Sequence, residues 1–102
     1  MKINLAQTFK DLDDNLMKDG DKPVTARHVI RVATTAELPE DSQGSSQEAL
    51  ERKMKNYDLY QKVSTCVDSE IELTPEEVVH IKQRISKIFG VLIVGPMVKL
   101  LA

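Results

Sequence analysis

The sequence contains one cysteine, Cys66, two histidines and no tryptophan. A lone cysteine excludes an intramolecular disulfide, and no cluster of Cys and His residues has the spacing of a metal site. We therefore expect a reducing, cytoplasmic compartment and no metal or other cofactor. Because only two Tyr and two Phe are present, a core must rest mainly on Ile, Leu, Val and Met.

Long hydrophobic runs are also missing. The most apolar stretch, residues 88–98, is shorter than the about 20 residues that span a bilayer, and the N-terminus has no apolar segment of signal-peptide length. The formal net charge of -2 excludes a surface built as a whole to neutralise phosphates. We expect no membrane association, and one small domain over residues 1–102, of which 41% are hydrophobic.

The first part of the chain has the pattern of short strands and turns. Ile3, Leu5 and Phe9 fit a strand with one buried face. Residues 13–15 and 19–23 are rich in Asp, Asn, Gly and Pro, which favour turns. The sequence thus predicts an α+β fold in which a short N-terminal β-hairpin or small sheet packs on three to four α-helices.

Two helices are predicted in the middle of the chain. One covers residues 26–36 after Thr25 as N-cap, and a longer one covers 46–66 after a capping box of Ser45 and Glu48. The residues between them, 37–47, are polar and predict a mobile loop. The inner side of the longer helix is expected to carry Leu50, Met54, Tyr57, Tyr60 or Gln61, and Val63.

The last third begins with a short alternating segment, 71–73, which we expect to pair with the first strand. Thr74 then caps a helix that has Pro75 at its first position and Glu77 for a capping box. This helix should stop near Gly90. Its predicted features are an apolar side of Val78, Ile81, Ile85, Ile88 and Phe89, and the basic residues Lys82, Arg84 and Lys87 placed to suit the helix dipole.

No residue pattern indicates catalysis. Asp11-x-Asp13-x-Asn15 begins like a calcium loop, but Leu16 and Lys22 stand where such a loop needs Gly and Glu, so a structural turn is the better interpretation. His28 and His80 lie in no recognisable constellation, and Cys66 has no cationic neighbours that would activate it. We therefore expect a protein that is not an enzyme.

One helix mixes cationic and aromatic residues, as nucleic-acid surfaces do; these residues are Arg52, Lys53, Lys55, Tyr57, Tyr60 and Lys62. Acidic residues interrupt the cluster. A solvated helix face with pairs such as Glu48 with Arg52 and Glu51 with Lys55 explains the same pattern better, so nucleic acid is not the expected partner.

The C-terminal tail is strongly apolar and must be buried in the core, in a homo-oligomer or against a protein partner; its candidate interface residues are Val91, Leu92, Ile93, Val94, Met97, Leu100 and Leu101. Gly95-Pro96 is expected to interrupt the tail, with one or two helical turns after it.

Several segments together resemble a group of small, mostly uncharacterised proteins of tailed phages and prophages: Ile3-x-Leu5 with Lys10-Asp11-Leu12-Asp13, the 19–23 turn, Glu72-Leu73-Thr74-x-Glu76, Ile81-Lys82, Val94-Gly95 and Leu100-Leu101. The resemblance implies a phage-encoded accessory protein in the host cytoplasm that binds another protein, such as a host factor or defence component. The alternatives are a morphogenesis or tail-assembly factor and a nucleic-acid-binding regulator. The group supplies no site residues.

Overall fold

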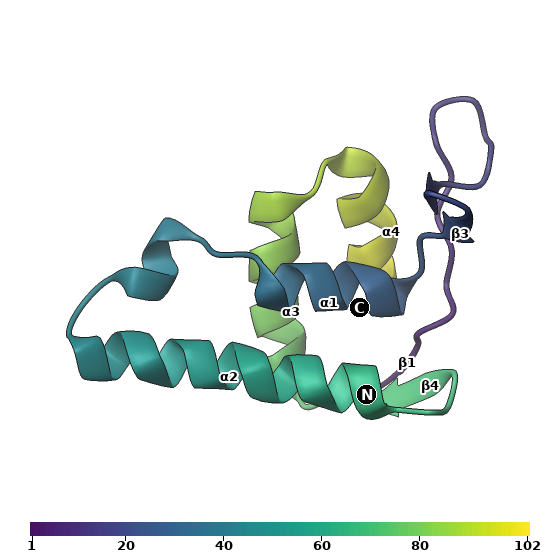
Figure 1. Ribbon diagram of the computed structural model, residues 1–102. Helices are drawn as coiled ribbons and strands as arrows, with labels where there is room; N and C mark the ends of the chain where they lie inside the picture. Colours follow the sequence, from purple (N-terminus) through teal and green to yellow (C-terminus); the bar gives the residue numbers. More distant parts are fainter.

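The computed structural model describes all of residues 1–102 and confirms the α+β prediction (Figure 1). Strands β1 (Lys2–Asn4) and β4 (Glu70–Glu72) pair antiparallel, with Ile3 opposite Ile71. The expected pairing of the late strand with the first is therefore confirmed. Strands β2 (Lys18–Asp19) and β3 (Lys22–Pro23) form a separate two-stranded hairpin.

The two predicted N-terminal turns are present, each with a residue in the left-handed region. Asp14 has φ 63° in the first turn, and Gly20 has φ 64° between β2 and β3. The Asp11 carboxylate accepts the backbone N–H groups of Asp13 and Asn15 at 2.9 and 3.0 Å. The calcium-like spacing thus serves an Asx-type turn, in which the carboxylate replaces a backbone acceptor.

The helices follow in the order α1 (Ala26–Thr35), the 3-10 helix η1 (Pro39–Ser42), α2 (Ser46–Thr65), α3 (Pro75–Ile88) and α4 (Val91–Leu100). Helix α1 packs against both α2 and α3, and α4 packs on α3 (Figure 1). No helix is both long and apolar enough to cross a membrane.

Helix α1 is the centre of the core, although its β-branched residues make it a weak helix former. Thr25 caps it as predicted, accepting the N–H of His28, and Val29, Ile30 and Ala33 are fully buried. Arg27 crosses to the end of α2 and donates to the carbonyl oxygens of Val63 and Cys66, both at 2.6 Å. Apolar burial and this bridge stabilise α1 where propensity does not.

Helix α3 matches its prediction closely. The Thr74 hydroxyl accepts the Glu77 N–H at 3.2 Å, and the Glu77 carboxylate accepts the Thr74 N–H at 2.9 Å, which closes the capping box. Its apolar side enters the core through Val78, Ile81 and Ile85. The helix ends at Ile88, two residues before Gly90.

The predicted interruption at Gly95-Pro96 is wrong, because α4 is one continuous helix through both residues. Pro96 has no N–H for the carbonyl oxygen of Leu92, four residues earlier. Leu92 and Pro96 are both exposed, so water can satisfy that carbonyl. Met97 and Leu101 are buried below them and hold the helix on the core.

The predicted inner side of α2 is right at Val63 but wrong for Leu50, Met54 and Tyr57. Leu50, Met54 and Tyr57 are 55%, 49% and 51% exposed, whereas Leu59 and Val63 are buried. Apolar residues with helical spacing lie on two sides of α2, and the side that carries Leu59 and Val63 packs on the core. The first half of α2 extends past the end of α1 (Figure 1). The exposed stripe lies on the side of α2 opposite the buried Leu59 and Val63.

The segment 37–47 contains the short helix η1, which the sequence analysis missed; the mobility of this segment stays a prediction. Asp41 of η1 is buried against Arg84 of α3, and Arg84 is itself only 3% exposed. Arg84 was expected to suit the dipole of its helix, and the structure places its charge inside the molecule, paired with Asp41. Its guanidinium is an internal link between η1, α1 and α3.

Candidate interaction surface around helix α2

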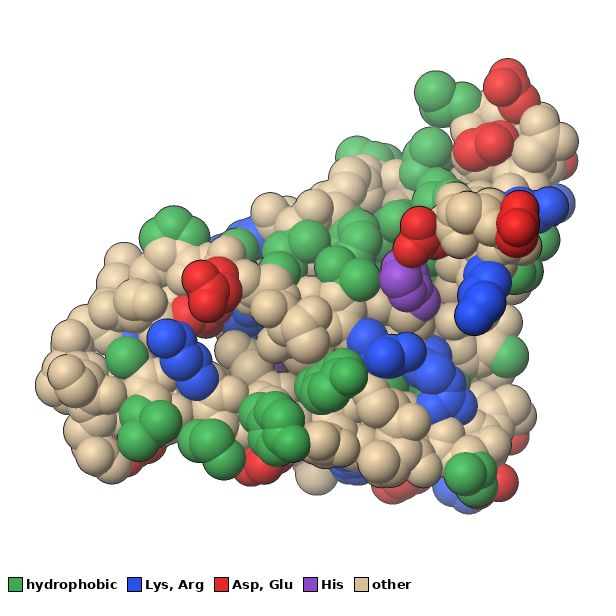
Figure 2. Space-filling model, in the orientation of Figure 1, with side chains coloured by type: hydrophobic (Ala, Val, Ile, Leu, Met, Phe, Trp, Pro, Cys, Tyr) green, Lys and Arg blue, Asp and Glu red, His purple; other side chains and the backbone are tan.

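Three apolar side chains, Leu50, Met54 and Tyr57, form what we call the α2 stripe. Their spacing of four and three residues places them on one side of the helix, opposite the buried Leu59 and Val63. Figure 2 shows hydrophobic side chains gathered along the edge of the molecule that α2 forms. Large apolar side chains that are half exposed in a row are typical of a binding surface.

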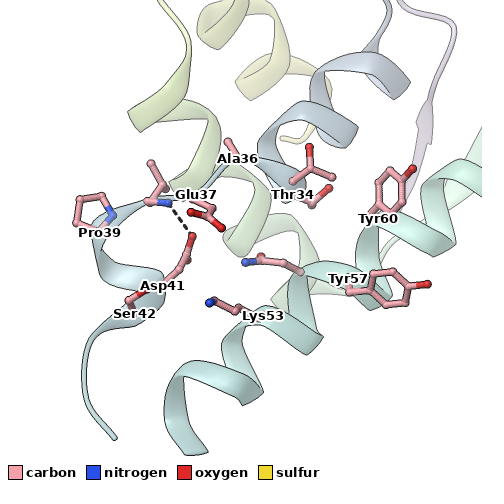
Figure 3. Close-up of a pocket in the computed structure, with 12 residues that line it drawn as sticks. Thr34, Ala36, Glu37, Pro39, Asp41, Ser42, Lys53, Tyr57 and Tyr60 are labelled. Carbon is pink, nitrogen blue, oxygen red and sulfur yellow. Dashed lines mark hydrogen bonds between the residues drawn. The ribbon is translucent and has the colours of Figure 1, made fainter. Parts of the chain in front are cut away.

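A first hollow of about 510 Å³ borders this stripe, between the end of α1, η1 and α2 (Figure 3). Tyr57 and Tyr60 line it with ring centroids 6.4 Å apart and planes tilted by 44°. Lys53 extends toward Asp41 on the opposite wall (Figure 3). The Arg31 guanidinium lies 5.6 Å from the Tyr60 ring centroid, and its hydrogen bonding and positive charge lower the pKa of the Tyr60 phenol.

A groove of about 620 Å³, which we call the α2–α3 groove, lies on the other side of the stripe. Leu50, Met54 and Leu59 form its apolar part. The Lys62 ammonium crosses its end and lies 2.7 Å from the Glu77 carboxylate. Burial raises the pKa of Glu77, but the hydrogen bond from Lys62 and the Thr74 N–H outweigh burial and lower it.

His80 of α3 lies at the junction of this groove with two smaller cavities. Its Nε2 is 2.6 Å from Asn56 Oδ1, so the neutral ring that donates to this amide oxygen carries its proton on Nε2. Burial, followed by the charges of Lys55 and Arg84, lowers the pKa of His80. The ring is therefore neutral at pH 7 and links α2 to α3.

The buried ion pair of Arg84 and Asp41 closes the space between η1, α1 and α3. Arg84 Nη1 and Nη2 lie 2.8 and 3.2 Å from the two Asp41 carboxylate oxygens, and Nη2 also donates to the Ala36 carbonyl oxygen at 2.6 Å. Burial raises the pKa of Asp41, but hydrogen bonds from Arg84 and the Leu38 N–H and the Arg84 charge outweigh it and lower the pKa. Sequence reasoning missed this pair.

The residues predicted as a nucleic-acid face do not share one face. Lys53, Tyr57 and Tyr60 line the first hollow, Lys55 and Lys62 line the α2–α3 groove, and Arg52 lines a smaller cavity together with Lys55. The predicted salt bridges of Glu48 with Arg52 and Glu51 with Lys55 are not formed; Glu51 accepts from Gln47 instead. Lys53 thus lies on a different side of α2 from Lys55 and Lys62.

The structure divides the predicted C-terminal interface residues by burial. Met97 and Leu101 lie in the core, and Ile93 and Leu100 pack against it while partly exposed. Val94 is partly exposed as well. Val91 is 84% exposed and Leu92 is 41% exposed, as is the neighbouring Val98 at 39%. Only the outer side of α4 is therefore available to a partner.

The remaining chemical candidates lie apart from these surfaces. His28 Nε2 is 3.4 Å from a carboxylate oxygen of Asp19, with both side chains on the surface. Cys66 is partly buried just past α2, and its thiol contacts the carbonyl oxygens of Asp68 and Glu70 at 3.7 and 3.5 Å. Neither arrangement brings a nucleophile and a base together.

Comparisons of the chain with protein-family models, with curated proteins and with solved structures find no match.

Proposed function

We propose that this protein acts by binding a partner protein, and that an amphipathic helix of the partner lies along the α2 stripe and the α2–α3 groove. The observation that carries the proposal is the half-exposed state of Leu50, Met54 and Tyr57 beside a groove of about 620 Å³. Helix-in-groove recognition uses apolar anchors at this spacing. Covering their remaining apolar surface would contribute about 25 cal/mol per Å².

The length and charges of α2 suit such a partner. A helix of 20 residues is about 30 Å long, which offers a continuous docking edge. Glu51 and Asp58 stand beside Lys55 and Lys62 along the groove, so both signs of charge border the apolar centre. A partner helix with complementary charges on its two sides would be fixed in one orientation.

The resemblance to phage and prophage proteins supports a further part of the proposal, that the partner is a host or phage protein bound during infection. On this proposal the gene lies among phage accessory genes. A position among tail genes would favour an assembly role instead.

The test compares the native protein with a Leu50→Glu/Met54→Glu double variant. Each protein is expressed with an affinity tag, and the bound proteins are quantified by mass spectrometry. Two carboxylates placed in the apolar docking surface should reduce capture of the specific partner at least about tenfold, the equivalent of about 1.4 kcal/mol. Titration of the purified partner then gives the affinities directly.

Leu12→Glu is the matched control, because Leu12 is 88% exposed in the N-terminal turn, away from α2. This variant carries the same kind of substitution and should capture the partner as the native protein does. Capture that is equal for the native protein and the double variant would refute the proposed site. Self-association lost in the double variant would identify a second copy of the chain as the partner.

A second candidate function, docking on a larger assembly, is favoured by the exposed Val91 and Val98 on α4. Deleting the C-terminus cannot test it, because Met97 and Leu101 belong to the core. The better variant is Val91→Glu/Val98→Glu, which leaves both anchors in place. Loss of assembled particles with unchanged melting temperature would support docking through α4, and normal particle yield would exclude it.

A further inference from the structure

The charged residues that α2 contributes to the α2–α3 groove alternate in sign. They follow one another at spacings of four, three and four positions, which keeps them on one side of the helix, next to the α2 stripe. In chain order their charges are negative, positive, negative and positive. We call these residues the α2 charge row; they are Glu51, Lys55, Asp58 and Lys62.

A row with this order of charges is complementary to its own reverse. When two copies of α2 pack antiparallel about a two-fold axis, the same side of each helix meets the same side of the other. Glu51 then faces Lys62 of the second copy, and Lys55 faces Asp58, and the axis repeats both pairs. A parallel arrangement would instead bring like charges together, which is unfavourable. The charge row therefore matches a second, antiparallel copy of α2.

The same alignment brings the two α2 stripes together. The two-fold axis passes near Tyr57 of both copies, and Met54 of each copy lies beside Tyr57 of the other. Contacts between a thioether and an aromatic ring are favourable. Leu50 closes the apolar contact at either end. Helix α2 lies along one edge of the molecule (Figure 1), and its stripe is opposite the buried side, so a second helix can approach it.

The two central residues of the charge row are the ones that a single chain leaves unused. Neither Lys55 nor Asp58 forms a salt bridge within the chain. Lys62, in contrast, already lies 2.7 Å from the Glu77 carboxylate. The pairs of Lys55 with Asp58 of the second copy are therefore the new ones, and they lie closest to the two-fold axis. They should contribute more to association than the pairs at the ends.

We infer that the helix that docks on the α2 stripe is α2 of a second copy of this chain, packed antiparallel about a two-fold axis. The inference rests on the proposed function, because it names the partner helix for the same docking surface. Each copy then supplies both the surface and the amphipathic helix that covers it, so the half-exposed Leu50, Met54 and Tyr57 are buried by their own counterparts.

The first experiment measures the mass of the full chain by analytical ultracentrifugation, from micromolar to millimolar concentration. We expect the native protein to form dimers and Leu50→Glu/Met54→Glu to remain monomeric. Lys55→Glu and Asp58→Lys each place like charges in the central pairs and should weaken self-association by about tenfold or more. Both positions are exposed, so the variants should melt at the native temperature.

An equimolar mixture of the two charge variants is the decisive measurement. The charge row of Lys55→Glu is complementary to the reversed row of Asp58→Lys, so the mixture should restore the native affinity although each variant alone associates weakly. Lys53→Glu is the matched control. It carries the same substitution as Lys55→Glu on the other side of the stripe, where Lys53 lines the first hollow, and should dimerise as the native protein does.

A native protein that stays monomeric at millimolar concentration would overturn the inference. If that monomer captures another protein that Leu50→Glu/Met54→Glu does not capture, the proposed function stands with a different partner, and if the two capture equally, both proposals fail. Native dimers that persist unchanged in Lys55→Glu, or a mixture that associates no better than its two components, would overturn the antiparallel pairing of the charge rows.

Discussion

Helices α2 and α3 are both capped and amphipathic, yet they use their side chains differently. The apolar side of α3 is buried through Ile81 and Ile85, whereas Leu50 of the α2 stripe stays half exposed. Each helix also contributes an arginine to the same cavity. Arg84 of α3 is fully engaged with Asp41 and backbone carbonyl oxygens, and Arg52 of α2 keeps two buried nitrogens without partners.

The buried residues of α3 stabilise the fold, whereas the stripe of α2 remains on the surface. An amphipathic pattern identifies the apolar side of a helix but does not show whether the same chain covers that side. In α3 the partner of each group lies inside the molecule, so its residues contribute to folding. In α2 the stripe stays half exposed, and two buried nitrogens of Arg52 make no hydrogen bond. Substitutions in α3 should therefore lower stability, and equivalent substitutions in α2 should lower binding.

The largest effect is expected for Arg84→Met, which leaves the Asp41 carboxylate buried without its cation. Loss of one member of a buried ion pair typically costs about 3–5 kcal/mol. Chemical denaturation at pH 7 measures the free energy of unfolding. A double variant, Arg84→Met/Asp41→Leu, should recover much of the loss because no charge is then buried alone. A loss below about 1 kcal/mol for Arg84→Met would contradict the internal role of this residue.

The same pair predicts a pH dependence. The folded-state pKa of Asp41 lies below its ordinary value of 3.8. A lowered pKa contributes stability that is fully present above the ordinary value and disappears as the pH falls through the folded-state value. The native protein should thus lose stability in acid more steeply than Arg84→Met. Equal slopes for the two proteins would show that Asp41 is not held by Arg84.

The next effect compares the apolar sides directly. Ile85→Ala removes a fully buried side chain from α3 and should cost about 2–5 kcal/mol. Leu50→Ala removes a half-exposed side chain from α2 and should change stability by no more than about 0.5 kcal/mol. Urea denaturation of the two variants gives both values. A loss above about 2 kcal/mol for Leu50→Ala would mean that the α2 stripe is covered within the molecule.

Local sequence rules predicted the features that local chemistry determines. The caps of Thr25 and Thr74, the turn at Asp14 and the ends of α3 depend on neighbours within a few residues. The pairing of β1 with β4 followed from two short alternating segments. The caps and turns were confirmed because their deciding contacts lie within a few residues, whereas β1 and β4 pair although they lie near residues 3 and 71 of the chain.

Contacts between distant residues decided what the sequence analysis missed. Asp41 and Arg84 are 43 residues apart, and no spacing rule connects them. The side of α2 that faces the core depends on how α1 packs against it, which no local pattern shows, so the exposed stripe was wrongly predicted to face inward. The helix through Pro96 depends on Met97 and Leu101 being anchored below it. The sequence did contain one signal for η1: Pro39 is followed by two acidic residues, as Pro75 is at the start of α3.

The smallest effect concerns the helix starts, where both α2 and α3 were expected to have a capping box. Ser45 accepts the Glu48 N–H at 3.2 Å, but the Glu48 carboxylate makes no return bond, whereas Glu77 bonds the Thr74 N–H and pairs with Lys62. Glu77→Ala should therefore cost about 1–2 kcal/mol, a typical capping loss, and Glu48→Ala less than about 0.5 kcal/mol. Glu77→Gln retains the capping geometry without the charge and should fall between them. Equal losses for Glu48→Ala and Glu77→Ala in thermal denaturation would show that the two helix starts are equivalent and that the contrast between α2 and α3 does not extend to their caps.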